Sequence, residues 1–406
     1  MYMFFEKFKR KIQPLINIYH LCIAILANLA YGFPSRKLVV IGVSGTDGKT
    51  TTTHLIHHVL KSYSSNSYMT SSISASGLHT TTPNSFTIQK LLKEFLSTGG
   101  KYFVIESTSH ALDQNRLWGI KFGASAITNI TFEHLDYHIN YLNYIKAKAK
   151  LLINSKISII NKDDKSFEIL AEYLKSKKTR YLTYSLLQKA DFNFDSNKEL
   201  GLNLAQFNNY NYLTAYSILK SLNLSDVVIT KSFKSFRLPE GRLEKIYDKE
   251  FKVIIDFAHT PNSFKNVLKE VSKFKRNRLI HVFGSAGLRD SQKRPFLGKI
   301  SSEYSDVIIL TEEDYRTEDV NKINEEIEAG ISKSLNLIKP EDFNKKSINV
   351  YSKITDRQQA IKKAISIATN GDIVIFTGKS HEKSLARGKK EYPWSESDTI
   401  KKFLQK

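Results

Sequence analysis

The sequence predicts an α/β protein in which two domains are each built on a mainly parallel sheet. Short apolar runs alternate with segments of helical periodicity along most of the chain, as expected for parallel strands covered by helices. The alternation is interrupted once, by the loop-forming run Pro239-Glu240-Gly241-Arg242. A glycine-bearing loop also follows the first strand, where α/β proteins commonly bind phosphate. We therefore expect an N-terminal segment at 1–37, a central domain at 38–236 and a C-terminal domain at 237–406.

The N-terminal segment is predicted to form an amphipathic helix with basic residues near both ends. No formal charge lies between Lys11 and Arg36. Apolar and polar side chains fall on opposite helical faces, the first comprising Leu15, Ile18, Cys22, Ile25, Leu26 and Leu29 and the second Gln13, Asn17, His20 and Asn28. Such a helix suits a membrane surface, or a groove on the protein itself, better than a bilayer core, although its length leaves a span open. We expect a cytoplasmic protein that contacts the inner face of the membrane through residues 7–33.

The central domain is predicted to begin with a strand at 38–41. Further strand-like runs lie at 102–105, 124–127 and 157–160, separated by helical patterns such as 88–96 and 144–152. The C-terminal domain repeats the alternation, with strands expected at 253–256, 278–283, 307–310 and 372–376. This second domain should be smaller and Rossmann-like.

The loop between the first strand and the next helix is predicted to be a P-loop. Lys49 is expected to reach the β- and γ-phosphates of a nucleoside triphosphate, and the Thr50 hydroxyl to bind Mg²⁺. Five residues separate Gly42 from Gly48, one more than in the common P-loop spacing. The loop that should contact the nucleotide comprises Gly45, Thr46, Asp47, Gly48, Lys49, Thr50 and Thr51.

Composition excludes several classes of protein. A single cysteine rules out a disulfide framework and a cysteine-based zinc site. The formal charge of +21 arises mostly from scattered lysines, and no nucleic-acid-binding motif accompanies it. We therefore expect anionic substrates and no nucleic-acid partner.

Polar residues follow two of the predicted strands directly. Glu106 ends one apolar run, and a later run is followed by a loop bearing His134 and Asp136. The carboxyl ends of parallel strands meet at one edge of a sheet, so these side chains should lie near the P-loop. The arrangement predicts a Mg²⁺ site.

Eight motifs in this order resemble those of the Mur ligases, over about nine-tenths of the chain. The motifs are GTDGKTTT (45–52), HTTTPNSFTIQ (79–89), IESTSHALDQNR (105–116), TNITFEHLDYH (128–138), PEGRLEK (239–245), DFAHTPNS (256–263), FGSAGLRDSQKRP (283–295) and TGKSHEKS (377–384). The chain is most similar to the branch that adds the third residue of the peptidoglycan stem peptide. The resemblance implies an ATP-dependent amide ligase that uses two Mg²⁺ ions and joins an amino acid, here a diamino acid, to a muramoyl-dipeptide through an acyl phosphate.

The resemblance also assigns roles to individual residues. Lys148 matches a lysine that is carbamylated in the family and would hold the second Mg²⁺, with Lys146 and Lys150 as near alternatives. Lys49, Lys148 and His259 match catalytic positions, and Thr50, Glu106, His134 and carbamylated Lys148 match metal ligands. The nucleotide would also contact Asn211, Arg242 and Asp256. The acceptor positions are Thr81, Thr108 and Arg116, and those for the incoming amino acid are Arg289, Arg316, Gly378 and Glu382.

Several departures from the family pattern leave alternatives open. Glu133 stands where the family has Asp, Glu313-Asp314-Tyr315-Arg316 replaces Asp-Asn-Pro-Arg, and Ser380 replaces a glycine. Family members carry a UDP-gripping domain of roughly a hundred residues before the P-loop strand, whereas 37 residues precede Leu38 here. UDP is then held differently, or by a partner protein, or the acceptor is not a UDP-sugar. The alternatives are a folylpolyglutamate-like or lipid-linked acceptor, and an inactive nucleotide-binding scaffold.

Overall fold

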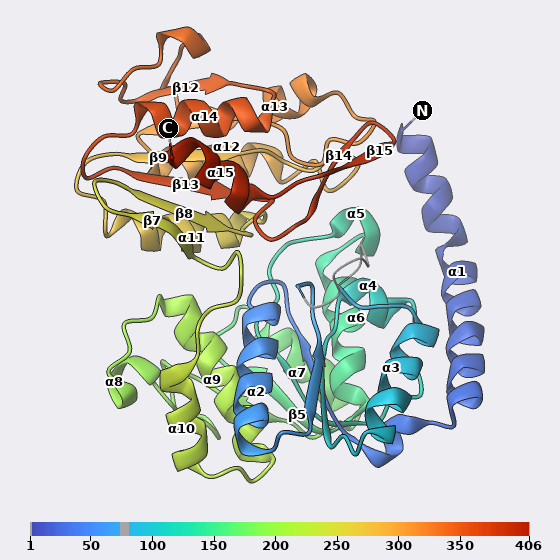
Figure 1. Ribbon diagram of the computed structural model, residues 1–406. Coiled ribbons are helices and arrows are strands. Elements are labelled where there is room, and N and C mark those ends of the chain that lie inside the picture. The colour runs from blue at the N-terminus through green and yellow to red at the C-terminus, as the bar shows by residue number, and fades with distance from the viewer. Residues whose placement is uncertain (1, 74–80, 406) are drawn as a thin grey trace. The chain divides into compact units, whose positions relative to one another are not determined.

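The computed structural model describes residues 2–73 and 81–405 and divides into two compact units, Met1–Arg237 and Leu238–Lys406 (Figure 1). Both units are α/β, which confirms the predicted fold class. His79 and Thr80, which belong to one of the eight motifs, lie outside the described residues.

Unit 1 is organised around a six-stranded parallel sheet in the order β2-β3-β1-β4-β5-β6. Chain order reverses direction at the central β1, so the loops after β1, β3 and β4 meet at one edge of the sheet, where α/β proteins bind ligands. The strands are β1 (Val39–Ser44), β2 (Ser67–Thr70), β3 (Tyr102–Glu106), β4 (Phe122–Ile127), β5 (Ser155–Asn161) and β6 (Leu182–Tyr184).

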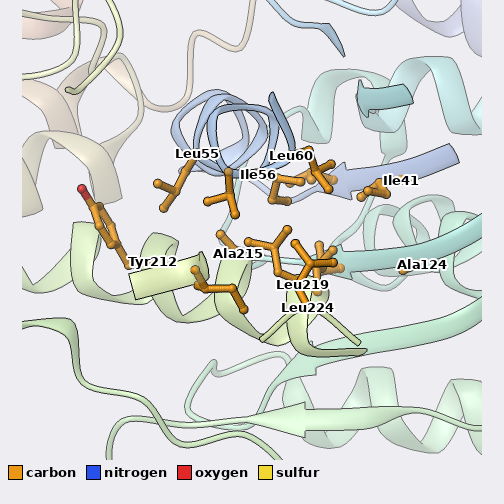
Figure 2. Packing of buried hydrophobic residues seen from close by; sticks show 14 of the residues in the cluster. Ile41, Leu55, Ile56, Leu60, Ala124, Tyr212, Ala215, Leu219 and Leu224 are labelled. Atoms are coloured by element: carbon orange, nitrogen blue, oxygen red, sulfur yellow. The ribbon is translucent and has the colours of Figure 1, made fainter. Parts of the chain in front are cut away.

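Helices cover both faces of this sheet. Leu55, Ile56 and Leu60 on one helix pack against Ala215 and Leu219 on another, with Ile41 and Ala124 of the sheet in the same cluster (Figure 2). A second cluster, containing Ile88, Leu92 and Phe103, fills the opposite face. The helices of unit 1 are α1 (Tyr2–Tyr31), the 3-10 turn η1 (Pro34–Lys37), α2 (Lys49–Tyr63), α3 (Ser85–Ser97), α4 (Ser109–Asp113), α5 (Leu135–His138), α6 (Tyr141–Ile153), α7 (Phe167–Ser176), α8 (Ser196–Leu200), α9 (Gln206–Ser221) and α10 (Asp226–Ser235).

The long helix α1 lies beside α3 (Figure 1) and turns its polar face toward the rest of unit 1. Gln13 Nε2 donates to Tyr137 Oη at 2.9 Å, Asn17 Nδ2 to Asp113 Oδ2 at 3.0 Å, and Asn28 Nδ2 to Trp118 O at 2.8 Å. The two faces are therefore those predicted from the sequence. The apolar face does not dock in a groove of unit 1, because it is the polar face that contacts the unit.

Unit 2 contains a seven-stranded sheet in the order β11-β12-β10-β9-β13-β8-β7, in which only β7 is antiparallel to its neighbour, and a separate hairpin of β14 and β15. The core contains Ile255, Val282 and Val374 from the strands and Ile361 from a helix. The strands are β7 (Glu244–Asp248), β8 (Lys252–Asp256), β9 (Leu279–Phe283), β10 (Val307–Leu310), β11 (Asn336–Leu337), β12 (Val350–Lys353), β13 (Ile373–Thr377), β14 (Ser384–Arg387) and β15 (Lys390–Pro393). The helices are α11 (Pro261–Ser272), α12 (Arg294–Tyr304), α13 (Val320–Glu328), the 3-10 turn η2 (Pro340–Asp342), α14 (Arg357–Ile367) and α15 (Glu396–Leu404).

Candidate active site

The loop between β1 and α2 requires glycine at two positions. Gly48 has φ of +81°, and a Cβ on it would stand 2.1 Å from Asn211 Oδ1. A Cβ on Gly45 would stand 1.9 Å from Thr128 Oγ1. The backbone therefore packs closely against α9 and the residue that follows β4, and the N-terminus of α2 is suited to bind phosphate. Asn211, expected to contact the nucleotide, lies beside this loop.

Lys49 and the loop backbone are held by short contacts. Lys49 Nζ donates to Thr46 O at 2.6 Å. The Asp47 carbonyl accepts from Thr128 Oγ1 at 2.6 Å, and the Asp47 N–H donates to Asn129 Oδ1 at 3.0 Å. Thr51 is buried in the first turn of α2. These bonds hold the shape of the loop.

Oxygen atoms suited to Mg²⁺ meet beside the loop. Thr50 Oγ1 donates to Glu106 Oε1 at 3.0 Å, and Ser72, which the sequence analysis missed, donates its N–H to Glu106 Oε2 at 2.9 Å. Glu106 is only 2% exposed. A hydroxyl and a carboxylate fit a Mg²⁺ ion that keeps several waters and phosphate oxygens. Among the described residues, no three His, Cys, Asp or Glu side chains gather as a metal cluster.

His134 is connected to the P-loop through Tyr144. His134 has φ of +55° and stands at the N-terminus of the short helix α5, with Nε2 3.6 Å from Glu133 Oε2. Its ring centroid lies 6.3 Å from that of Tyr144, whose hydroxyl lies 3.1 Å from Thr46 Oγ1. His110 packs against His134 with ring centroids 4.7 Å apart.

Lys148 is buried against the P-loop. Its Nζ donates to Gly45 O at 2.6 Å and lies 4.5 Å from the centroid of the Tyr144 ring. Burial, followed by the nearby Lys49 ammonium, holds the pKa of Lys148 well below its usual value. The neutral amine, which is the form that reacts with CO₂, is thereby favoured. The two alternatives lie elsewhere, because Lys146 reaches over the Tyr173 ring and Lys150 donates to Asp113 O at 3.0 Å.

The residues predicted to hold the acceptor surround α4. Thr108 caps this helix by accepting from Ala111 N at 3.3 Å, and its own N–H donates to Thr82 Oγ1, which donates to Glu106 O at 2.9 Å. Thr81 is half-buried next to Thr82. Arg116 follows α4, and its buried Nε has no hydrogen-bond partner among the described residues. Burial lowers the pKa of Arg116.

In unit 2, three predicted residues gather at the carboxyl end of β8. Asp256 accepts from Leu243 N at 2.8 Å and Ala258 N at 2.7 Å. The Arg242 guanidinium lies 4.8 Å from the centroid of the Phe257 ring. His259 Nδ1 lies 2.9 Å from Phe257 O, and the His259 and Phe257 rings are in contact.

Glu382, one of the residues expected around the incoming amino acid, belongs to a second cluster. Lys379 Nζ lies between Asp314 Oδ1 at 2.8 Å and Glu382 Oε2 at 2.6 Å. Burial alone would lower the pKa of Lys379, but the two carboxylates outweigh it and raise this pKa. Burial raises the pKa of Glu382, and Lys379 opposes that shift.

The other three residues of this prediction are placed differently. Arg316 donates from Nη1 to Gly287 O at 2.9 Å and to Asp314 O at 3.2 Å, so it borders the cluster. Gly378 has φ of +97°, and a Cβ there would stand 2.5 Å from Glu313 Oε2. Arg289 is exposed in the loop after β9 and contacts no member of the cluster in the described structure. Asp314 and Lys379 were not predicted as site residues. Asp314 lies in the segment 313–316 that contains Arg316, and Lys379 lies in the motif 377–384 that contains Gly378 and Glu382.

Comparison with known proteins identifies the family of the chain. Residues 43–225 match the Mur ligase middle domain, and residues 241–380 match the Mur ligase glutamate ligase domain. The UDP-N-acetylmuramoyl-L-alanyl-D-glutamate--2,6-diaminopimelate ligase of Aquifex aeolicus is 36% identical over 92% of this chain and 79% of its own length. The enzyme of the same name from Clostridium perfringens is 32% identical over 89% of this chain and 77% of its own length.

A solved structure of a ligase of this name is also similar. It is 26% identical to the chain, with a TM-score of 0.57 over 91% of this chain and 78% of that one. Fold and site together thus define an ATP-dependent, ADP-forming amide ligase. The chain belongs to the Mur ligase family.

Proposed function

We propose that this ligase joins a diamino acid to the terminal carboxylate of a muramoyl-dipeptide, as a step in the synthesis of peptidoglycan precursors. The observation that carries the proposal is the pair formed by Thr50 and Glu106 beside the P-loop, 3.0 Å apart and almost completely buried. The pair suits the Mg²⁺ ion on which phosphoryl transfer depends. The names of the relatives from Aquifex aeolicus and Clostridium perfringens supply the substrate class.

The reaction consists of two displacements. The acceptor carboxylate takes the γ-phosphoryl group of ATP, so the bond from phosphorus to ADP breaks and a bond to the carboxylate forms. The incoming amine then attacks the acyl carbon, phosphate leaves, and the amine loses a proton. Lys49 is proposed to orient the transferred group, and Arg242 and Asp256 are proposed to contact the nucleotide. Magnesium bound by Thr50 and Glu106 would screen the charge of the phosphates, with His134 and Lys148 as ligands of a second ion.

A carbamate on Lys148 is part of this proposal. Its support is the buried Nζ, the lowered pKa and the position 2.6 Å from the Gly45 carbonyl. A carbamate converts the cationic side chain into an anionic oxygen ligand. His259 stays a catalytic candidate because it stands in the turn that follows Asp256.

The preference for a diamino acid rests on charges in unit 2. The carboxylates of Asp314 and Glu382 suit a substrate ammonium group, and Arg316 suits a distal carboxylate. Thr81, Thr108 and Arg116 are proposed to hold the dipeptide, with the unpartnered Arg116 Nε directed to one of its oxygens. Arg289 and Gly378 complete the amino-acid set.

The test is phosphate release from ATP by the purified protein with a panel of muramoyl-dipeptides and amino acids. We expect release only when acceptor, amino acid and Mg²⁺ are all present. Glu106→Gln should reduce it by about a hundredfold or more and raise the Mg²⁺ concentration that is needed. Glu94→Gln, at an exposed carboxylate on α3, is the matched control. If no combination elicits acceptor-dependent release, the scaffold alternative is favoured instead.

The proposed site of action is the cytoplasm, where ATP and precursors are available, at the inner face of the membrane. A folylpolyglutamate-like activity predicts release with glutamate when a folate replaces the muramoyl-dipeptide as acceptor, so adding a folate to the panel distinguishes it.

A further inference from the structure

The outward face of α1 is a continuous strip of apolar side chains. Leu15 is 66% exposed, Leu26 54% and Leu29 62%. Ile18, Tyr19 and Cys22 lie between them and are also exposed. These six residues stand at positions i, i+3, i+4, i+7, i+11 and i+14 and so form one face of the helix. No described element of unit 1 covers this apolar strip.

The opposite face holds α1 in this orientation. Gln13, Asn17 and Asn28 bond to Tyr137, Asp113 and the Trp118 carbonyl, as described above. Asn28 is completely buried. Rotating the helix to hide its apolar strip would break these bonds and bury their partners' polar atoms against apolar side chains without hydrogen bonds. The hydrogen bonds of the polar face therefore keep the apolar strip of α1 exposed.

Basic residues flank the strip at both ends. Lys7, Lys9, Arg10 and Lys11 precede it, and Arg36 and Lys37 follow it on η1. No acidic residue occurs between Glu6 and Asp47. Apolar residues on one face with lysine and arginine around them are typical of helices that lie in the interface of an anionic membrane.

We propose that α1 docks this unit on an anionic lipid surface, with the strip in the boundary between headgroups and acyl chains. Over Ile12–Tyr31 the helix is long and apolar enough to cross a bilayer, and 17% of that stretch is buried. A span would detach Gln13, Asn17 and Asn28 from unit 1 and carry them into hydrocarbon, so the helix lies along the surface. A second copy of the chain is a poorer occupant, because pairing two strips brings together basic clusters on molecules of charge +21. This docking is independent of the ligase reaction.

Cys22 provides a direct probe, because it is the only cysteine and it lies on the strip. The full-length protein would be labelled there with an environment-sensitive fluorophore and mixed with vesicles of phosphatidylcholine, with or without phosphatidylglycerol. We expect a blue shift and about tenfold or stronger binding with the anionic vesicles, weakened by salt. Quenchers placed at the headgroup level should reach the label better than quenchers at the bilayer centre.

Charge placed on the strip should abolish docking. Leu15→Glu combined with Leu26→Glu is expected to weaken vesicle binding about tenfold or more. The matched control is Leu187→Glu combined with Val227→Glu, at residues of unit 1 that are 72% and 76% exposed and lie outside α1. Both double variants should keep the circular dichroism spectrum and the ATPase rate in solution, since neither touches the site.

Three results would overturn the proposal. One is an unchanged emission spectrum and no co-sedimentation with anionic vesicles. Another is stronger quenching from the bilayer centre, which would indicate a span. The third is a dimer in light scattering that Leu15→Glu and Leu26→Glu dissociate, which would assign the strip to a second copy.

Discussion

Lys148 combines burial, a nearby cation and a short contact to the P-loop, and we expect its replacement to impair catalysis. Lys148→Ala should lower kcat by about a hundredfold or more, because one proposed oxygen ligand of the second Mg²⁺ is lost. Acetate or formate should restore part of the rate by occupying the space of the carbamate. Lys146→Ala, on the same helix over the Tyr173 ring, should keep nearly full activity. Full activity of Lys148→Ala without added carboxylate would exclude the carbamate.

Gly48→Ala should damage nucleotide binding more than stability. The new Cβ would stand 2.1 Å from Asn211 Oδ1 in a backbone of φ +81°, so the loop must move from the start of α2. We expect the Kd for ATP to rise about tenfold or more and the melting temperature to fall by a few degrees. Calorimetric titration with ATP measures the first effect. The control is Gly99→Ala, which shares a positive φ but has open space around it.

His281 gives unit 2 a pH-dependent stability. Burial lowers the pKa of His281 to about 3, and its ring bonds to Ser301 and Thr377 hydroxyls. Below the unfolded pKa of about 6.5 the unfolded chain takes up a proton and the folded chain does not, so stability falls as the pH drops from about 6.5 toward 3. The slope is about 1.4 kcal/mol per pH unit.

His281→Gln should remove that part of the slope. Between about pH 7 and pH 5, the variant should lose about 2 kcal/mol less unfolding free energy than the parent. Urea unfolding of both proteins at the two pH values tests this. Parallel pH profiles would contradict the assignment.

Some residues of the site could be predicted from the sequence and others could not. Glu106 was found because it ends an apolar run, and parallel strands bring such ends together. Ser72 was missed because it follows β2, a short strand with half-exposed residues and no apolar run. The position of Asn211 beside Gly48 depends on the packing of α9 against α2, which are far apart in the chain.

At the scale of elements, the cap of α11 offers a clean test. The Thr260 hydroxyl accepts from Ser263 N at 3.1 Å, and Ser263 Oγ accepts from Thr260 N at 3.0 Å. Thr260→Ala should lower the unfolding free energy of unit 2 by about 1 kcal/mol. Thr399→Ala, inside α15 of the same unit, should change it little, because alanine is a better helix former. Equal losses of unfolding free energy in the two variants would show that the cap does not stabilise unit 2.

Buried parallel strands were easier to predict than edge strands. The apolar runs at 124–127 and 307–310 fall within β4 and match β10, respectively. β7 and β12 were not predicted, because their residues are partly exposed and mix charges with apolar side chains. The hairpin of β14 and β15 was not predicted for the same reason.

At the scale of the whole molecule, each unit has its own hydrophobic core, and damage should stay local. Leu219→Ala removes a completely buried side chain from the core shown in Figure 2. It should cost about 2–5 kcal/mol and lower the melting temperature of unit 1 by roughly 2–4 °C per kcal/mol. Scanning calorimetry should show an unshifted transition for unit 2. Leu187→Ala, at an exposed position, is the control.

The orientation of α1 shows what a sequence pattern leaves undecided. Periodicity separates an apolar face from a polar one but does not say which meets the protein. Asp113 and Tyr137 decide it here, from positions about a hundred residues further along the chain. Helix patterns usually imply an apolar face turned inward, so these distant hydrogen-bond partners had to be seen in three dimensions.

The left-handed backbone of His134 has a consequence for how this ligase can evolve. A φ of +55° on a residue other than glycine costs the fold about 1 kcal/mol. Glycine or asparagine would relieve that cost but would remove the imidazole proposed to bind metal. Selection for thermostability alone would therefore favour a more stable but inactive protein. If histidine persists at position 134 during laboratory evolution, function is under selection as well.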